Sequence, residues 1–344
     1  MTLSPPRPTL SHRAHRGALL AVCVLLILPL AALSLFIGSR TIGPGTVMEA
    51  LLHADPTNDD HLVIWNSRLP RAFIAVCGGA CLGVAGALMQ SLTRNALAEP
   101  GTLGVNAGAA AGVVTGLFIV GSTSIAVYVW FAFAGAALAA LLVHRLGRAH
   151  EAGQNSVRLV LAGAGISVTL GSFTTLAILA GPSEVFSSMR SWATGSIEGR
   201  DWSYLPIPAV ALVVGALACV YLAGPLNSTT LGADLGRALG VNIPLTWGLT
   251  NLTIILLAGA ATAAMGPVSF VGLAAPHVAR TVAGPDHRWL LPFSGVFATI
   301  LLLLADIAGR VVVAPSEIGA GIMSAFIGAP FFIGLIRRGK VAGL

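Results

Sequence analysis

Few residues of this chain could carry out chemistry, and the most informative is a lysine. Lys340, near the C-terminus, is the only lysine among the 344 residues. A P-loop needs a lysine after a glycine-rich turn at the start of a helix, so the chain cannot hydrolyse a nucleotide by that route. Schiff-base chemistry is excluded for the same reason, and no His-Glu-x-x-His or Cys-x-x-Cys motif occurs. We therefore expect no catalytic site, no cofactor and no metal centre.

Asp306 is the only carboxylate expected deep inside an apolar segment. A buried carboxylate is typical of proton relays in ion-coupled transporters. Arg310 follows one helical turn later on the same face, where the two side chains can form an ion pair. The pair suits a structural role, and it leaves open the alternative of a secondary carrier that couples to ions through Asp306.

The elements that must position these residues are membrane-spanning helices. The chain is 56% hydrophobic and only 9% charged, far from the composition of a soluble domain. Eight windows lack Asp, Glu, Lys and Arg over a length that can cross a bilayer, and two of them are long enough for two crossings each. We expect an all-α integral membrane protein with ten transmembrane helices in one domain, residues 17–338. The windows are Gly17–Ser39, Ala72–Thr93, Pro100–His144, Leu159–Ser183, Trp202–Ala233, Ala238–Ala279, Trp289–Ala305 and Ile318–Ile336.

An even number of crossings places both ends of the chain on one side of the membrane. The tails, 1–16 and 339–344, are basic or follow basic residues, which favours the cytoplasm under the positive-inside rule. With that topology, 13 of the 19 basic residues lie inside. The net charge of +6 is thereby explained by membrane orientation, and no nucleic-acid partner is needed.

Glycine and proline predict how these helices pack and where one of them ends. Many of the 41 glycines lie at small-xxx-small spacing, which lets helix backbones approach closely in lipid. Gly266-Pro267 interrupts the window 238–279 and predicts a long helix followed by a short one.

Two further features allow more than one interpretation. Arg68, Arg71 and Arg310 fall at the outer ends of segments, against the positive-inside trend. They are either snorkelling anchors or docking groups for acidic residues of an external protein. The segment Leu231–Val241 reads as a short amphipathic helix that stops at Gly240, and it is either a connector or a contact for a cytoplasmic partner.

A series of motifs follows in order along the chain. They are Arg68-Leu69-Pro70-Arg71, Gly86-x-x-Met89-Gln90, Arg94 to Gly104, Trp192-x-x-Gly195-Ser196, Leu231 to Val241, Gly266 to Arg280, Asp286-His287-Arg288, Ala305-Asp306-x-x-x-Arg310 and Gly328 to Phe332. The series resembles the permease subunits of ABC importers for iron-siderophores and cobalamin, the type II importers, over about residues 63–338. Ala96 departs from the pattern, because the family usually has proline there.

The resemblance implies a fold like that of the cobalamin-importer permease and a set of partners. These are a second permease subunit, identical or related, two copies of a cytoplasmic ABC ATPase and an extracytoplasmic solute-binding protein. It also implies roles for individual residues. The residues implied to dock the binding protein are Arg68, Arg71 and Arg310. Those implied to couple to the ATPase are Leu231, Gly232, Asp234, Arg237, Leu239 and Gly240. The cytoplasmic gate falls to Asn95, Leu97, Asn155 and Ser156, and pathway lining to Ser167, Thr169, Ser172 and Ser324.

The function implied by the resemblance is import of a ferric siderophore across the bacterial inner or plasma membrane. The permease would alternate between outward and inward openings, driven by separate ATPase subunits, and would not itself be an enzyme. Cobalamin or haem is an alternative cargo for the same machinery.

Overall fold

Every segment predicted to span the membrane is a helix in the structure, a computed structural model. The structure describes the chain except for residues 1–9, 39–40, 121–124, 148–155, 231 and 338–344. Seven helices of the described residues are long and apolar enough to cross a membrane. The apolar stretches of α5 and α14 are shorter, and α12 has only 13 residues. The helices that correspond to the predicted segments are α1 (Leu10–Phe36), α4 (Leu69–Thr93), α5 (Val105–Val120), α6 (Ile125–Leu146), α7 (Ser156–Ala180), α9 (Pro206–Thr229), α11 (Ile243–Met265), α12 (Val271–Ala283), α13 (His287–Val311) and α14 (Ala320–Arg337).

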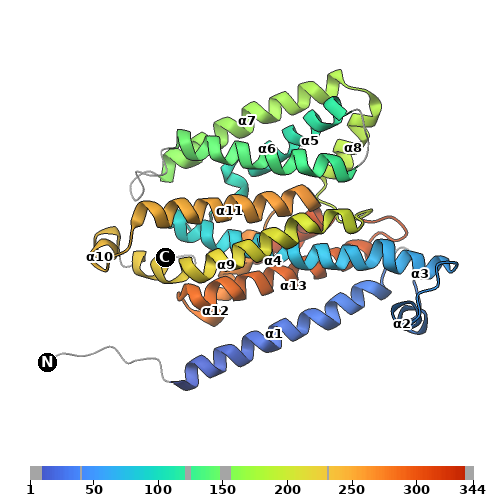
Figure 1. Cartoon of the computed structure of the whole chain (residues 1–344), viewed down its shortest axis with the longest axis horizontal. Helices are drawn as coiled ribbons and strands as arrows, with labels where there is room; N and C mark the ends of the chain where they lie inside the picture. The colour runs from blue at the N-terminus through green and yellow to red at the C-terminus, as the bar shows by residue number, and fades with distance from the viewer. Residues whose placement is uncertain (1–9, 39–40, 121–124, 148–155, 231, 338–344) are drawn as a thin grey trace.

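The core of the molecule is built around α4, α11 and α13, which are the most deeply buried of the long helices. α4 packs against α13, α11 and α12, and α5 packs against α6 and α7. α1 lies obliquely along one side and α7 along the opposite side (Figure 1). Both expose most of their apolar surface, as expected of helices that face lipid or another subunit.

Glycines let the core helices touch backbone to backbone, as their spacing predicts. A Cβ atom on Gly86 of α4 would collide with the carbonyl oxygen of Gly272 in α12. In the same way, a Cβ atom on Gly112 of α5 would collide with the carbonyl oxygen of Phe131 in α6. These close approaches replace the hydrophobic driving force that is missing between helices in lipid.

The chain breaks where Gly266-Pro267 predicts. α11 ends at Met265, and Gly266 takes a positive φ of 76°, a conformation that glycine adopts without strain. Phe270, which precedes α12, also has a positive φ, 67°, which is uncommon for a bulky residue. Its backbone N–H donates to the Glu99 carboxylate at 3.1 Å. The carboxylate thereby helps to hold the strained start of α12.

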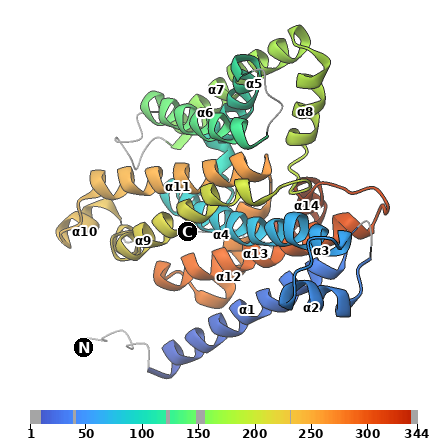
Figure 2. The same cartoon turned by 45° about the vertical axis from the view of Figure 1, so that its right-hand side comes forward.

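Short helices that the sequence did not predict lie at the end opposite α10 (Figure 2). They fall within the polar stretches 40–71 and 184–204, where charges interrupt the apolar pattern. The chain runs from α3 through a π-helical turn into α4 without a break, so this helix extends well beyond the predicted start. These elements are α2 (Pro44–Leu52), α3 (Asp59–Val63), η1 (Ile64–Arg68), α8 (Ser183–Ala193) and the 3-10 turn η4 (Trp202–Tyr204). α10 (Ala233–Ala238) and the 3-10 turn η2 (Pro100–Leu103) complete the described elements.

Candidate functional site

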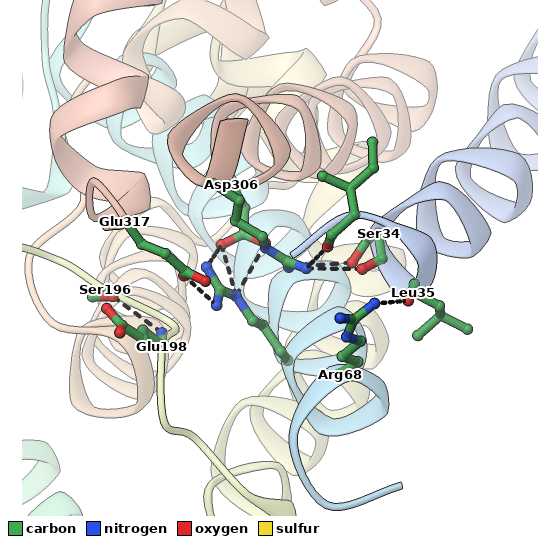
Figure 3. A network of polar contacts seen from close by, with 10 residues as sticks. Ser34, Leu35, Arg68, Ser196, Glu198, Asp306 and Glu317 are labelled. Carbon is green, nitrogen blue, oxygen red and sulfur yellow. Dashed lines mark hydrogen bonds and ion pairs between the residues drawn. The ribbon is translucent and has the colours of Figure 1, made fainter. Parts of the chain in front are cut away.

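A buried ionic cluster joins α4, α13 and the segment before α14. Arg71 donates to Asp306 from Nε and from Nη2, at 3.0 and 2.8 Å, and its Nη1 donates to Glu317 at 2.7 Å. Arg310 pairs with the other oxygen of Asp306, as the one-turn spacing predicted. Figure 3 shows Asp306 and Glu317 facing the same guanidinium group. Asp306 is therefore held between two cations.

Arg310 of this cluster and the neighbouring Arg68 cap the C-terminal end of α1. Arg310 Nη1 donates to the carbonyl oxygens of Ser34 and Ile37, at 2.8 and 2.9 Å. Arg68 donates to the carbonyl oxygen of Leu35 (Figure 3) and to that of Phe36. The last carbonyls of a helix have no partner within it, and cations stabilise the negative end of the helix dipole. These contacts fasten the end of α1 to α4 and α13.

Arg68, Arg71 and Arg310, which were expected to dock the binding protein, are buried side chains in this structure. They are only 5%, 7% and 2% exposed, and their guanidinium groups contact this chain itself. The sequence did not show which way these side chains turn. Asp306 is ill suited to proton coupling, because protonation would break its ion pairs with Arg71 and Arg310. An ion-coupled carrier is therefore not favoured.

α10 forms an exposed helical turn at the opposite end of the molecule, inside the segment 231–241. Gly232 and Gly240 flank it with positive φ values of 109° and 82°, which lets the chain turn sharply on both sides. Asp234 and Arg237 are exposed and pair at 2.7 Å. Leu239 is 59% exposed. Leu231 lies outside the described residues.

Of the predicted gate residues, Asn95 and Leu97 fall on a turn after α4. Asn95 and Leu97 are exposed, and the Asn95 side-chain oxygen accepts the backbone N–H of Leu97 at 2.9 Å. This bond is an Asx turn, which shapes the chain after α4 without proline. Ser156 is the first residue of α7, and Asn155 lies outside the described residues.

Two polar clusters that sequence reasoning did not single out lie next to the Asn95 turn. In the first, Arg280 Nη1 donates to Gln90 Oε1 at 2.6 Å, and His277 Nε2 lies 2.9 Å from the Ala96 carbonyl oxygen. This cluster ties α12 to the end of α4. In the second, His287 contacts Ser91 through Nε2 at 2.7 Å and Asn227 through Nδ1 at 2.8 Å. The motifs contained most of these residues, but their contacts join segments far apart in the sequence.

Three of the four predicted pathway residues lie on α7. Thr169 and Ser172 are exposed and Ser167 is half-buried. The hydroxyls of Thr169 and Ser172 donate to the carbonyl oxygens of Gly165 and Val168, one turn earlier. Their hydrogen bonds are therefore satisfied within the helix, and they present methyl or methylene groups with a weakly polar oxygen.

The fourth predicted pathway residue, Ser324, lies on α14. Its side chain is fully buried, and its hydroxyl lies 2.8 Å from the Gly321 carbonyl oxygen and 3.0 Å from that of Ser269. These contacts join α14 to the break between α11 and α12. An open cavity of about 610 Å³ lies on another face of α14. Its lining includes Pro267, Ile322, Ala325, Phe326 and Ala329.

These features define a class of protein: an all-helical chain with several candidate membrane spans, a buried ionic cluster and an exposed helical turn at one end. Comparison with known proteins gives the particular family. A profile described as the FecCD transport family matches residues 24–338. The chain belongs to the FecCD transport family.

Relatives and a solved structure agree with this assignment over nearly the whole chain. The ferric enterobactin transport system permease protein FepD of Escherichia coli K12 is 41% identical over 92% of this chain and 93% of its own length. The iron(3+)-hydroxamate import system permease protein FhuB of Bacillus subtilis 168 is 36% identical over 95% and 85%. An inward-facing metal-chelate type ABC transporter superposes with a TM-score of 0.79 at 28% identity, covering 94% of this chain and 99% of that one.

Proposed function

We propose that this chain is the permease subunit of an ABC importer that carries a ferric siderophore across the bacterial inner or plasma membrane. The observation that carries the proposal is the full-length likeness to permeases named for ferric enterobactin and iron-hydroxamate. Cobalamin and haem are also bulky metal chelates, but no feature of this chain favours them over a siderophore.

The proposed partners follow from the family of ABC importer permeases to which the chain is similar. Two copies of an ABC ATPase supply the energy, and a second permease subunit, identical or related, completes the pathway. A solute-binding protein delivers the chelate from outside. In the membrane the chain crosses ten times with both termini in the cytoplasm, because this topology places most arginines inside.

α10 is the proposed contact with the ATPase. Its exposed surface carries Leu235, Arg237 and Leu239, which suits a groove on a soluble partner. ATP binding and hydrolysis move the two ATPases, and α10 transmits that motion to α9 and α11. The permease thereby shifts between an outward and an inward opening, a two-state change biased by the nucleotide.

The passage is proposed to run along surfaces that bind weakly. The exposed face of α7 with Thr169 and Ser172, and the cavity on α14 with Phe326, offer apolar and self-satisfied hydroxyl groups. Such a surface suits a bulky chelate, because tight binding would hinder release. Asn95 and Leu97, with the turn at 155–156, form the cytoplasmic gate in this proposal.

The outer face is the proposed site of the binding protein. It comprises α2, α3 and α8, at the end opposite α10 (Figure 1). Arg68 and Arg310 support this face from inside by fixing the end of α1, and Arg71 joins α4 to α13 beside them. Arg68→Glu is therefore expected to lower the melting temperature of the permease as well as its affinity for the binding protein. A loss of affinity at an unchanged melting temperature would instead support the hypothesis that Arg68 contacts the binding protein directly.

Two experiments test the proposed function. A strain that lacks the chain's gene is expected to lose uptake of radiolabelled ferric siderophore and to regain it with the intact gene. Uptake that survives deletion, with no paralogue present, would contradict the cargo. Co-purification from membranes is expected to recover two ATPase copies and two permease subunits per complex, and recovery of the chain without any ATPase would contradict the class.

A further inference from the structure

An apolar groove of about 660 Å³ runs along the outside of the helix bundle, away from the cavity on α14. Its floor is made by α4 and α13, and its walls by α1 and α9. The groove is deep because three of the residues that line it, Ala80, Ala216 and Gly295, have small or no side chains. The groove is large enough for a drug-sized ligand, for which about 300–1,000 Å³ is typical.

The groove has the length of one lipid chain. It extends from Arg288, in the first turn of α13, to Thr299 in the middle of that helix. Eleven residues at ~1.5 Å each span about 16 Å, roughly half of the ~30 Å hydrocarbon core of a bilayer. At the inner limit, the Thr299 hydroxyl donates to the Val76 carbonyl oxygen at 3.2 Å, so that end offers no free polar group. The groove therefore suits an acyl chain of one leaflet.

The open end of the groove is basic. Arg288 is exposed and lines it, and the Arg16 guanidinium from α1 lies beside Gly284, in the turn just before α13. On the other side of His287, a cavity of about 210 Å³ holds Arg94 and Arg280. The Nη2 atom of Arg280 is buried without a hydrogen-bond partner among the described residues.

Asp286 and His287 also lie at this end, and both side chains are already hydrogen-bonded within the chain. Asp286 is the acidic residue beside Arg288, and its carboxylate accepts the Asn227 amide at 2.6 Å and the Arg288 backbone N–H at 3.0 Å. His287 is bonded through both ring nitrogens and leaves no site for a ligand. Arg16 and Arg288 against the one carboxylate of Asp286 give this end a net positive charge, and Arg94 and Arg280 add positive charge in the neighbouring cavity.

We propose that the groove binds one anionic phospholipid, with an acyl chain between α1 and α9 and its phosphate beside Arg288 and Arg16. Basic pockets at the ends of membrane helices bind anionic headgroups, and only lipid in the bilayer has both a chain of this length and a negative charge. In the proposed membrane orientation the lipid comes from the cytoplasmic leaflet.

The test uses the full chain in nanodiscs of phosphatidylglycerol and phosphatidylcholine. A trace of phosphatidylglycerol carries a photoactivatable diazirine in its acyl chain. Adducts mapped by mass spectrometry are expected on groove residues such as Val220 and Val296, and unlabelled phosphatidylglycerol should compete better than phosphatidylcholine. Adducts spread evenly around the molecule would overturn the proposal, as would equal competition by the two lipids.

Variants separate the chain from the headgroup. Ala216→Phe fills the groove and is expected to abolish the groove adducts. Arg288→Gln is expected to weaken phosphatidylglycerol retention in native mass spectrometry about fivefold, the factor for about 1 kcal/mol per arginine near an anionic surface. Arg145→Gln, which changes an exposed arginine in the last turn of α6, is the matched control and should retain the lipid fully.

The remaining outcomes are also decisive. Unchanged groove adducts in Ala216→Phe, or equal retention in Arg288→Gln and Arg145→Gln, would contradict the site. Cross-links from the groove to a second protein chain would show a different occupant. Because these measurements need neither ATP nor a siderophore, failure here is distinguishable from failure of the proposed import function.

Discussion

The arginines at the end of α1 each use a planar group with several donors to join elements that are distant in sequence. Arg310 contacts a carboxylate through Nη2 and two backbone carbonyls through Nη1, and its planar, always charged guanidinium holds these donors in fixed directions. Glu317 adds a second carboxylate on Arg71. The cluster is buried, so each partner left alone would be a charge removed from water.

Replacing Asp306 tests this fastening. Asp306→Asn leaves Arg71 and Arg310 without their shared carboxylate, and we expect a loss of about 3–5 kcal/mol in the free energy of unfolding. Thermal unfolding of the purified subunit, followed by size-exclusion chromatography, measures the effect. Arg237→Gln breaks the exposed pair with Asp234 and should leave the melting temperature unchanged, since exposed pairs contribute little. A stable Asp306→Asn subunit with lost uptake would revive the ion-coupled carrier.

Glu99 offers a second test at the scale of one residue. Glu99→Ala removes the acceptor of the Phe270 N–H, and an unsatisfied buried N–H destabilises by about 1–3 kcal/mol. Glu99→Gln keeps a carbonyl oxygen at that position and should retain most of the stability. The comparison of the two unfolding curves isolates the hydrogen bond. Equal losses in both variants would mean that the negative charge matters and the N–H contact does not.

At the scale of elements, the sequence predicted the helices well and their orientation about their own axes poorly. Windows free of charge located the long apolar helices, and Gly266-Pro267 located the break, because lipid and backbone geometry leave few alternatives. The burial of Arg68 and Ser324 was not predicted, because a segment of apolar residues all round does not reveal which face is buried. α2, α3 and α8 were missed because they are short and lie among polar residues.

The contact between α5 and α6 gives a prediction for one helix pair. Gly112→Leu places a side chain against the Phe131 carbonyl, so α5 and α6 must separate, and we expect clear loss of folded protein. Gly165→Ala on α7 meets no atom within 4 Å and serves as the control. Fluorescence-detected size-exclusion chromatography of both variants reports the folded fraction. A well-folded Gly112→Leu protein would contradict the packing of this pair.

α10 gives a prediction for one element and one partner. Leu239 is exposed, so Leu239→Asp should leave the permease folded while reducing ATPase co-purification and siderophore uptake. Val220→Ala changes a still more exposed residue on α9 and should affect neither. If Leu239→Asp retains full ATPase binding, α10 is not the contact.

For the whole molecule, the property to test is the topology: which side of the membrane the end with α2 and the end with α10 each face. In a background without the four native cysteines, Asp55→Cys should react with an impermeant maleimide applied outside intact cells. Leu239→Cys should react only after the cells are opened. The reverse pattern would mean that the proposed topology is inverted. Labelling of both cysteines from outside would contradict the proposal that Asp55 and Leu239 lie on opposite sides of the membrane.

The cap on α1 has a consequence for biosynthesis. Ser34 and Arg310, which meet in the finished protein, are 276 residues apart in the sequence. At a synthesis rate of ~5–20 residues per second, α1 waits about 15–55 s in the membrane before Arg310 is made. During that interval Arg68 and Arg71 are already present, and of these two, Arg68 is the one that contacts carbonyls of α1. The first helix to enter the membrane is thus among the last to be fully secured.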